Sequence, residues 1–209
     1  MRHLILALLL SAPGLVGAYP HIFVATGLAP VLDADGRLRG IEVTSRYDAF
    51  YSLPVLEDLE LDGDHDGVLD TGEMARLDGF DMQWVAGYEG DLVVEEGARK
   101  LALGPPEPRG GRFEDGMIST KHFRPIEGAG KGPFVMRAYD PTCYTAHDLG
   151  LGIAAPEVCD AEVIVPDPGA AEKRLQADLA KLPRDAESNF PEIGDVFSEK
   201  VLLRCRADS

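Results

Sequence analysis

The segment from Asp62 to Glu73 has the residue types and spacing of the twelve-residue calcium loop of an EF-hand. Such a loop places its ligands at positions 1, 3, 5, 7, 9 and 12. In this chain those positions hold Asp62, Asp64, Asp66, Val68, Asp70 and Glu73. Calcium takes six to eight oxygen ligands, so the segment predicts a calcium site.

The details of the loop fit the same prediction. Gly67 stands at position 6, where the chain must turn sharply. Val68 would offer its backbone carbonyl, Asp70 would act through a water, and Glu73 would bind with both oxygens. The alternative is an acidic, solvated turn between two helices. Close carboxylates repel each other by about 1 kcal/mol per pair even in water, and a bound cation would remove this repulsion.

The loop requires a helix on each side, and both flanks carry apolar residues three or four positions apart. They are Phe50, Leu53, Leu56 and Leu59 before the loop, and Met74, Leu77, Phe80 and Trp84 after it. Pro54 is expected in the first turn of the entering helix, where proline is tolerated. We therefore predict a helix–loop–helix unit at about residues 49–87, inserted between two strands.

Residues 1–18 are predicted to form a secretory signal peptide. Arg2 and His3 precede an apolar run from Leu4 to Leu10, and small residues end at Ala18. The run is too short to span a bilayer, which takes about 20 apolar residues. Cleavage would leave residues 19–209 as a single exported domain, which we expect in the periplasm. The alternative is a buried N-terminal strand or helix.

The composition restricts the classes of partner. The chain has 209 residues and a formal net charge of −16. Such a charge repels nucleic acid and anionic membrane surfaces and attracts cations, although solubility alone explains most of the acidic excess. No segment after the signal is apolar enough to cross a membrane. We therefore expect no nucleic-acid partner and no membrane-embedded segment after signal removal.

Three cysteines are present, Cys143, Cys159 and Cys205. In an oxidising compartment two of them should pair, and spacing alone leaves three pairings open. Cys159 begins one alternating apolar run and Cys205 ends another, so two neighbouring strands could bring them together. We favour a Cys159–Cys205 disulfide with Cys143 left free. Closing the loop between Cys159 and Cys205 would stabilise the folded protein by about 2–4 kcal/mol.

The rest of the chain reads as many short strands separated by turn residues. Strands are predicted at His21–Leu32 and Leu38–Tyr47, joined by a hairpin turn at Asp33–Gly36. Shorter alternating runs follow at 92–95, 100–103, 112–115, 117–125, 134–139 and 144–149. One helix is expected from Pro168 to about Leu182. The fold class is therefore α+β, with an antiparallel sheet or sandwich as scaffold for the inserted helix–loop–helix unit and this one further helix.

Several segments together resemble a bacterial family of exported proteins of unknown function. They are Pro20-His21-Ile22-Phe23-Val24, Tyr47-Asp48-Ala49-Phe50-Tyr51-Ser52, Asp58 to Glu73, Tyr139-Asp140-Pro141-Thr142 and Phe197 to Cys205. Members are often described as the periplasmic component of an uncharacterised ABC-type transport system. The resemblance also implies that cysteines matching Cys159 and Cys205 recur. Genes for such proteins often lie near nickel or cobalt exporters, which implies a role in metal handling.

One departure from the family concerns the start of the mature chain. The family typically begins with His-Pro-His, whereas this chain has Tyr19-Pro20-His21. Tyr19 cannot supply an imidazole, so a transition-metal site here would rest on His21, which is otherwise a histidine at the start of an exposed strand. His122 and His147 lie on expected strands without a partner at ligand spacing. A site assembled from distant strands stays open.

These observations favour a periplasmic calcium-binding protein that serves as an accessory component of a transport or metal-homeostasis system. A membrane transporter component is the candidate protein partner. The alternative is a carrier or chaperone for nickel, cobalt or zinc, with His21 as one ligand. An enzyme is less favoured, because the sequence has no nucleophile elbow, no His-Glu-x-x-His and no Gly-rich phosphate loop.

Overall fold

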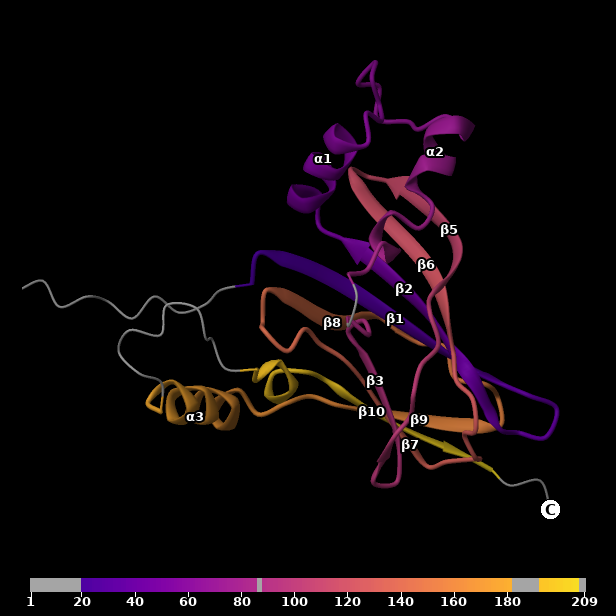
Figure 1. Ribbon diagram of the computed structural model, residues 1–209, viewed down its shortest axis with the longest axis vertical. Coiled ribbons are helices and arrows are strands. Elements are labelled where there is room, and N and C mark those ends of the chain that lie inside the picture. The colour runs from indigo at the N-terminus through magenta and orange to yellow at the C-terminus, as the bar shows by residue number, and fades with distance from the viewer. Residues whose placement is uncertain (1–19, 86–87, 182–191, 207–209) are drawn as a thin grey trace, which may run out of the picture.

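Two five-stranded β-sheets form the body of the protein, and a pair of short helices extends from one of them (Figure 1). The computed structural model describes residues 20–85, 88–181 and 192–206. The predicted signal peptide falls outside these residues. The α+β class is confirmed, since both sheets are largely antiparallel and helices are few.

Sheet A has the strand order β5-β6-β2-β1-β8. Its strands are β1 (Ile22–Leu32), β2 (Leu38–Tyr47), β5 (Glu107–Glu114), β6 (Met117–Pro125) and β8 (Thr145–Ile153). The predicted hairpin joins β1 to β2, where the Asp33 carboxylate accepts hydrogen bonds from the backbone of Asp35 and Arg37. Gly36 there adopts a φ of +74°, a left-handed conformation that glycine reaches without steric cost. Strand β8 is parallel to β1, an exception to the antiparallel pairing expected from the sequence.

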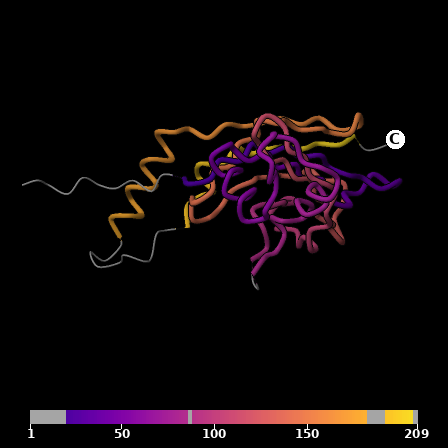
Figure 2. Tube along the Cα trace, turned by 90° about the horizontal axis from the view of Figure 1, so that it is seen from above, coloured from indigo at the N-terminus to yellow at the C-terminus, as the bar shows by residue number. Residues whose placement is uncertain are grey.

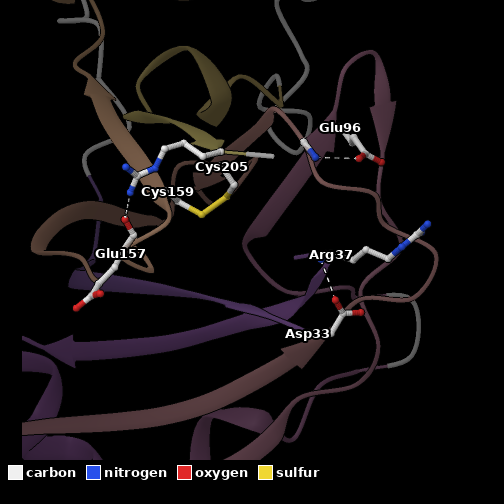
Figure 3. The surroundings of a disulfide bond; sticks show 8 residues. Asp33, Arg37, Glu96, Glu157, Cys159 and Cys205 are labelled. Carbon is white, nitrogen blue, oxygen red and sulfur yellow. Dashed lines mark hydrogen bonds between the residues drawn. A yellow bond between two sulfur atoms is a disulfide. The ribbon is translucent and has the colours of Figure 1, made fainter. Parts of the chain in front are cut away.

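Sheet B has the strand order β4-β3-β7-β10-β9. Its strands are β3 (Leu92–Glu96), β4 (Arg99–Lys100), β7 (Phe134–Ala138), β9 (Cys159–Ile164) and β10 (Lys200–Cys205). The last two strands pair with Cys159 directly opposite Cys205, and these residues form the disulfide that we predicted (Figure 3). Cys143 is not part of any disulfide.

The main core lies between the inner faces of the two sheets. Sheet A contributes Leu28, Ile41 and Val43, and sheet B contributes Val94, Phe134, Met136, Val201 and Leu203. Alternate residues of β6 and β7 are buried, as a sheet with one buried face requires. Figure 2 shows α3 (Pro168–Leu179) extending to the side of this body.

The helix–loop–helix unit stands between β2 and β3 and differs from the prediction in two respects. Helix α1 (Ala49–Asp58) contains Pro54 in its sixth position rather than in its first turn. Its buried residues are Ser52, Val55 and Leu56, so the predicted inward position of Phe50 is wrong, since that side chain is 91% exposed. The inward face follows from docking on the sheet, which the helix sequence alone does not specify.

The second helix is shorter than its apolar spacing suggested. Helix α2 (Thr71–Leu77) ends before Asp78, and Gly79 then takes a left-handed φ of +73°. A single 3-10 turn, η1 (Phe80–Met82), follows. Phe80 and Trp84 therefore lie beyond the helix, and the chain crosses the face of sheet A before it enters β3. None of the helices in the described ranges is long and apolar enough to cross a membrane.

Candidate metal loop and interior polar cavity

The Asp62–Glu73 loop brings three of its predicted ligands together. Side-chain oxygens of Asp62, Asp64 and Asp66 lie within 4.8 Å of one another. Gly67 has a φ of +78°, and its N–H donates to Asp62 Oδ1 over 3.1 Å. The backbone thus folds back on the first ligand position, as a tight cation-binding loop requires.

The residues at the later ligand positions, Asp70 and Glu73, form hydrogen bonds at the start of α2 instead of joining the three aspartates. Asp70 is the N-cap of α2, where Oδ1 accepts from the N–H of Glu73 over 2.8 Å. Glu73 completes a capping box, with Oε2 accepting from Asp70 N–H and Oε1 from Asp62 N–H. Glu73 therefore ties both ends of the loop together through its two oxygens. Val68 donates its N–H to Asp66 Oδ1 over 2.7 Å.

A small second core fixes the helix–loop–helix unit on sheet A. It consists of Val55, Leu56, Leu61, Leu77 and Ile118. Ser52, which is fully buried, accepts a hydrogen bond from the backbone N–H of Ile118 on β6 over 3.0 Å. The same hydroxyl donates to the Asp48 carbonyl over 2.8 Å. Although the loop is exposed, the helices that carry it are thus tied to the sheet.

A polar cavity lies between the main core and this second core. Its volume is about 220 Å³. It is lined by main-core residues such as Leu28 and Val43, by Tyr47 and Tyr51, which pack against the second core, and by a group of polar side chains. That group includes Thr26, Ser45, Asp81, Asp91, His122 and His147. The inner face of sheet A supplies four of these residues. Asp81 of η1 and Asp91, just before β3, come from the chain segment that crosses that face.

Asp81 and His122 form one side of the cavity. Asp81 Oδ2 accepts hydrogen bonds from the hydroxyls of Tyr47 (2.7 Å) and Thr120 (2.6 Å). Burial, and then the nearby Asp81 carboxylate, raise the pKa of Tyr47 well above its ordinary value, so its hydroxyl keeps its proton and donates. Burial lowers the pKa of His122 to about 4, and Arg124 adds to this decrease while Asp81 opposes it. His122 is therefore uncharged at neutral pH.

His147 forms the other side of the cavity. Its Nε2 lies 3.0 Å from Asp91 Oδ2, and its Nδ1 lies 3.2 Å from the Thr26 hydroxyl. The imidazole is thus held from both ring nitrogens, which fixes its orientation. Asp91 also accepts a hydrogen bond from the Tyr88 hydroxyl. These contacts join β1 and β8 to the segment that crosses them.

Arg124 anchors the crossing segment to β6. Its side chain is 2% exposed, and it donates to the carbonyls of Gly104 (2.9 Å) and Glu89 (2.8 Å). The guanidinium carbon lies 4.7 Å from the centre of the Trp84 ring, a cation–π contact. Gly90 passes so close that an added Cβ would lie 2.5 Å from Arg124 Nη1. The chain at this point therefore requires glycine for space as well as for its φ of +82°.

The other predicted site residues are dispersed. His21 is exposed, and its ring centre lies 4.9 Å from that of Tyr144. The partly buried Cys143 lines a different pocket, and burial raises the pKa of its thiol. Among the described residues, Asp62, Asp64 and Asp66 are the only trio of His, Cys, Asp or Glu ligand atoms within 4.8 Å of one another. The transition-metal site at His21 stays a prediction.

Reasoning from the sequence missed the cavity as a site. The available signal was on β6, where Thr120, His122 and Arg124 share one alternating face with the apolar Ile118. The opposite face carries Met117, Ser119, Lys121 and Phe123. This face is no more polar than the first. The alternation therefore does not reveal which face is buried, and Asp81 lies about forty positions away in the sequence.

The fold and the loop define a two-sheet α+β protein with an inserted helix–loop–helix unit. A family model described as "Protein of unknown function (DUF1007)" matches residues 4–205, so the chain belongs to this family. Searches of curated proteins and of solved structures found no match. Its function must therefore be argued from its own sites.

Proposed function

We propose that this is an exported calcium-binding protein, an accessory component of a transport or metal-homeostasis system, whose Asp62–Glu73 loop holds one Ca²⁺. The observation that carries the proposal is the convergence of the Asp62, Asp64 and Asp66 carboxylates, with Gly67 folded back on Asp62. Two unit charges 4.8 Å apart in water repel by about 0.9 kcal/mol. A divalent cation replaces this repulsion by attraction.

Calcium binding at this loop would also use Glu73. A Glu73 side chain that turned toward the aspartates would exchange its two backbone hydrogen bonds for the ion, as the last position of an EF-hand loop does. Because α2 begins at the loop, the ion would fix the orientation of α2 on sheet A. The expected role of the ion is therefore structural support of the helix–loop–helix unit.

Location in the periplasm is part of this proposal. It is supported by the Cys159–Cys205 disulfide, because disulfides persist in oxidising compartments. The wider role in transport rests on the resemblance described above. Identification of the proteins that cross-link to this chain in the intact cell envelope would test it, and the absence of any transporter component among them would count against it.

Calorimetric titration with Ca²⁺, together with thermal unfolding, tests the loop. We expect one ion per chain with a dissociation constant of about 10⁻⁴–10⁻³ M, as in other extracellular modules. At ten times that constant, Ca²⁺ should stabilise the fold by about 1.4 kcal/mol. Neither heat nor a shift in unfolding temperature at millimolar Ca²⁺ would overturn the proposal.

A matched pair of variants locates the effect. Asp64 and Asp35 are both exposed, and the side chain of neither accepts a hydrogen bond from another described residue. Asp64→Asn should weaken Ca²⁺ binding about tenfold or more, whereas Asp35→Asn, with the same loss of charge in the β1–β2 turn, should leave it unchanged. Equal effects of the two substitutions would mean that only the overall charge matters.

A further inference from the structure

The cavity contains two polar atoms whose hydrogen-bonding capacity is not used. Asp81 Oδ1 and His122 Nδ1 are both buried and have no partner among the described residues. Both side chains line the same cavity, and His122 is only 8% exposed. A buried polar atom without a partner costs about 1–3 kcal/mol. A fold that keeps two of them on one cavity wall points to a ligand that satisfies both.

The chemistry of the two groups restricts that ligand. An ionised carboxylate oxygen only accepts hydrogen bonds, and burial favours the uncharged imidazole, which keeps a lone pair on one ring nitrogen. Two electron-pair donors from residues that line one cavity, one nitrogen and one oxygen, complement a cation. Imidazole and carboxylate together suit zinc, cobalt or nickel, whereas calcium takes oxygen ligands.

The surroundings hold these two groups in place. Asp81 Oδ2 is fixed by the hydroxyls of Tyr47 and Thr120, which leaves Oδ1 as the free oxygen. The Asp81 carbonyl accepts a hydrogen bond from the Trp84 indole over 2.8 Å. The Trp84 ring stands edge-on to His122, with ring centres 6.4 Å apart. Such supporting contacts orient metal ligands and raise affinity.

We propose that the cavity binds one divalent first-row transition-metal ion through Asp81 Oδ1 and the His122 imidazole. No third His, Cys, Asp or Glu ligand atom in the described ranges converges with these two in the way that the loop aspartates do. Water therefore completes the coordination shell, and a cavity of about 220 Å³ has room for several molecules of about 30 Å³ each. The site is separate from the calcium loop and does not depend on it.

The test uses Co²⁺ and Zn²⁺ on the purified protein with excess Ca²⁺ present, so that the loop is occupied. Co²⁺ should produce d–d absorption bands of nitrogen and oxygen coordination at one ion per chain. His122→Ala and Asp81→Asn should each weaken Co²⁺ binding about tenfold or more. The matched control is His65→Ala, which removes an exposed histidine of the loop, and it should leave the bands unchanged. His21→Ala should also leave the bands unchanged.

A measurement on the unaltered protein guards against variants that fail to fold. With histidine ring carbons labelled, Zn²⁺ should shift the His122 NMR signals and leave those of His65 and His21 in place. Asp64→Asn should weaken Ca²⁺ binding about tenfold or more but keep the Co²⁺ bands, which separates this proposal from the calcium proposal. The absence of Co²⁺ bands, bands that survive His122→Ala, or Zn²⁺ shifts confined to His21 or His65 would each overturn the proposal.

Discussion

The Asp62–Glu73 loop and the interior cavity both gather acidic and polar groups, but they do so under opposite physical conditions. The loop places Asp62, Asp64 and Asp66 within five positions of sequence, with Asp64 and Asp66 exposed to water. The cavity joins residues as far apart as Thr26 and His147, which are separated by 121 positions. Water screens the loop charges at little cost, whereas each buried group in the cavity must find a partner.

This difference predicts where the protein is fragile. Loss of the Asp64 carboxylate, which accepts no hydrogen bond from a described residue, removes a repulsion and leaves nothing unsatisfied in the absence of calcium. Loss of one cavity group leaves its former partners buried without hydrogen bonds. The loop should therefore govern ion binding with little effect on the ion-free fold, and the cavity should govern stability.

The largest expected effect is that of Arg124→Met. This change would leave the carbonyls of Gly104 and Glu89 without their donors and remove the contact with Trp84. We expect a loss of about 3–4 kcal/mol in the free energy of unfolding, measured by urea denaturation. Arg112→Met is the control, because Arg112 is exposed on β5 and should cost less than about 1 kcal/mol. Equal losses of stability in the two variants would show that Arg124 in the cavity contributes no more to the fold than an arginine on the surface.

The second effect is a pH dependence that comes from His122. Its pKa is about 4 in the folded protein and about 6.5 in the unfolded chain, so the unfolded chain binds the proton more tightly. The free energy of unfolding should therefore fall as pH decreases through this range, by up to about 3 kcal/mol. The charged groups that face the ring are Asp81 of η1, which favours protonation, and Arg124 of β6, which disfavours it.

Denaturation curves from pH 7 to pH 4, with chelator present, would measure this slope. His122→Gln cannot gain the proton, so its stability should fall less steeply over the same range. His65→Gln, in the exposed loop, should keep the slope of the unaltered protein. A His122→Gln variant as pH-sensitive as the parent would show that other groups cause the dependence.

The same contrast explains how much could be predicted from the sequence. The convergence of Asp62, Asp64 and Asp66, the β1–β2 hairpin and the limits of β6 follow from patterns within about a dozen residues, and the Cys159–Cys205 pairing follows from two alternating runs. The cavity could not be predicted, because it depends on the route of the chain between α2 and β3. The helix ends at Leu77 because Asp78 takes an extended conformation, and the left-handed Gly79 then directs Asp81 onto sheet A. The apolar spacing through Trp84 predicted a longer helix. Trp84 instead lies beyond the helix end, where it contacts Arg124 and His122.

Ser52→Ala tests whether the loop is as local as this comparison implies. Ser52 lies on α1 but contacts β6, so its loss would leave the buried N–H of Ile118 without an acceptor. We expect a loss of about 1–2 kcal/mol in the free energy of unfolding. The Ca²⁺ dissociation constant, measured by calorimetry, should change less than about twofold, because every predicted ligand lies between positions 62 and 73. Ser119→Ala, on the outer face of β6, serves as the control for both measurements. A large change in Ca²⁺ affinity would mean instead that sheet A sets the loop geometry through α1, and that the loop and the cavity respond together.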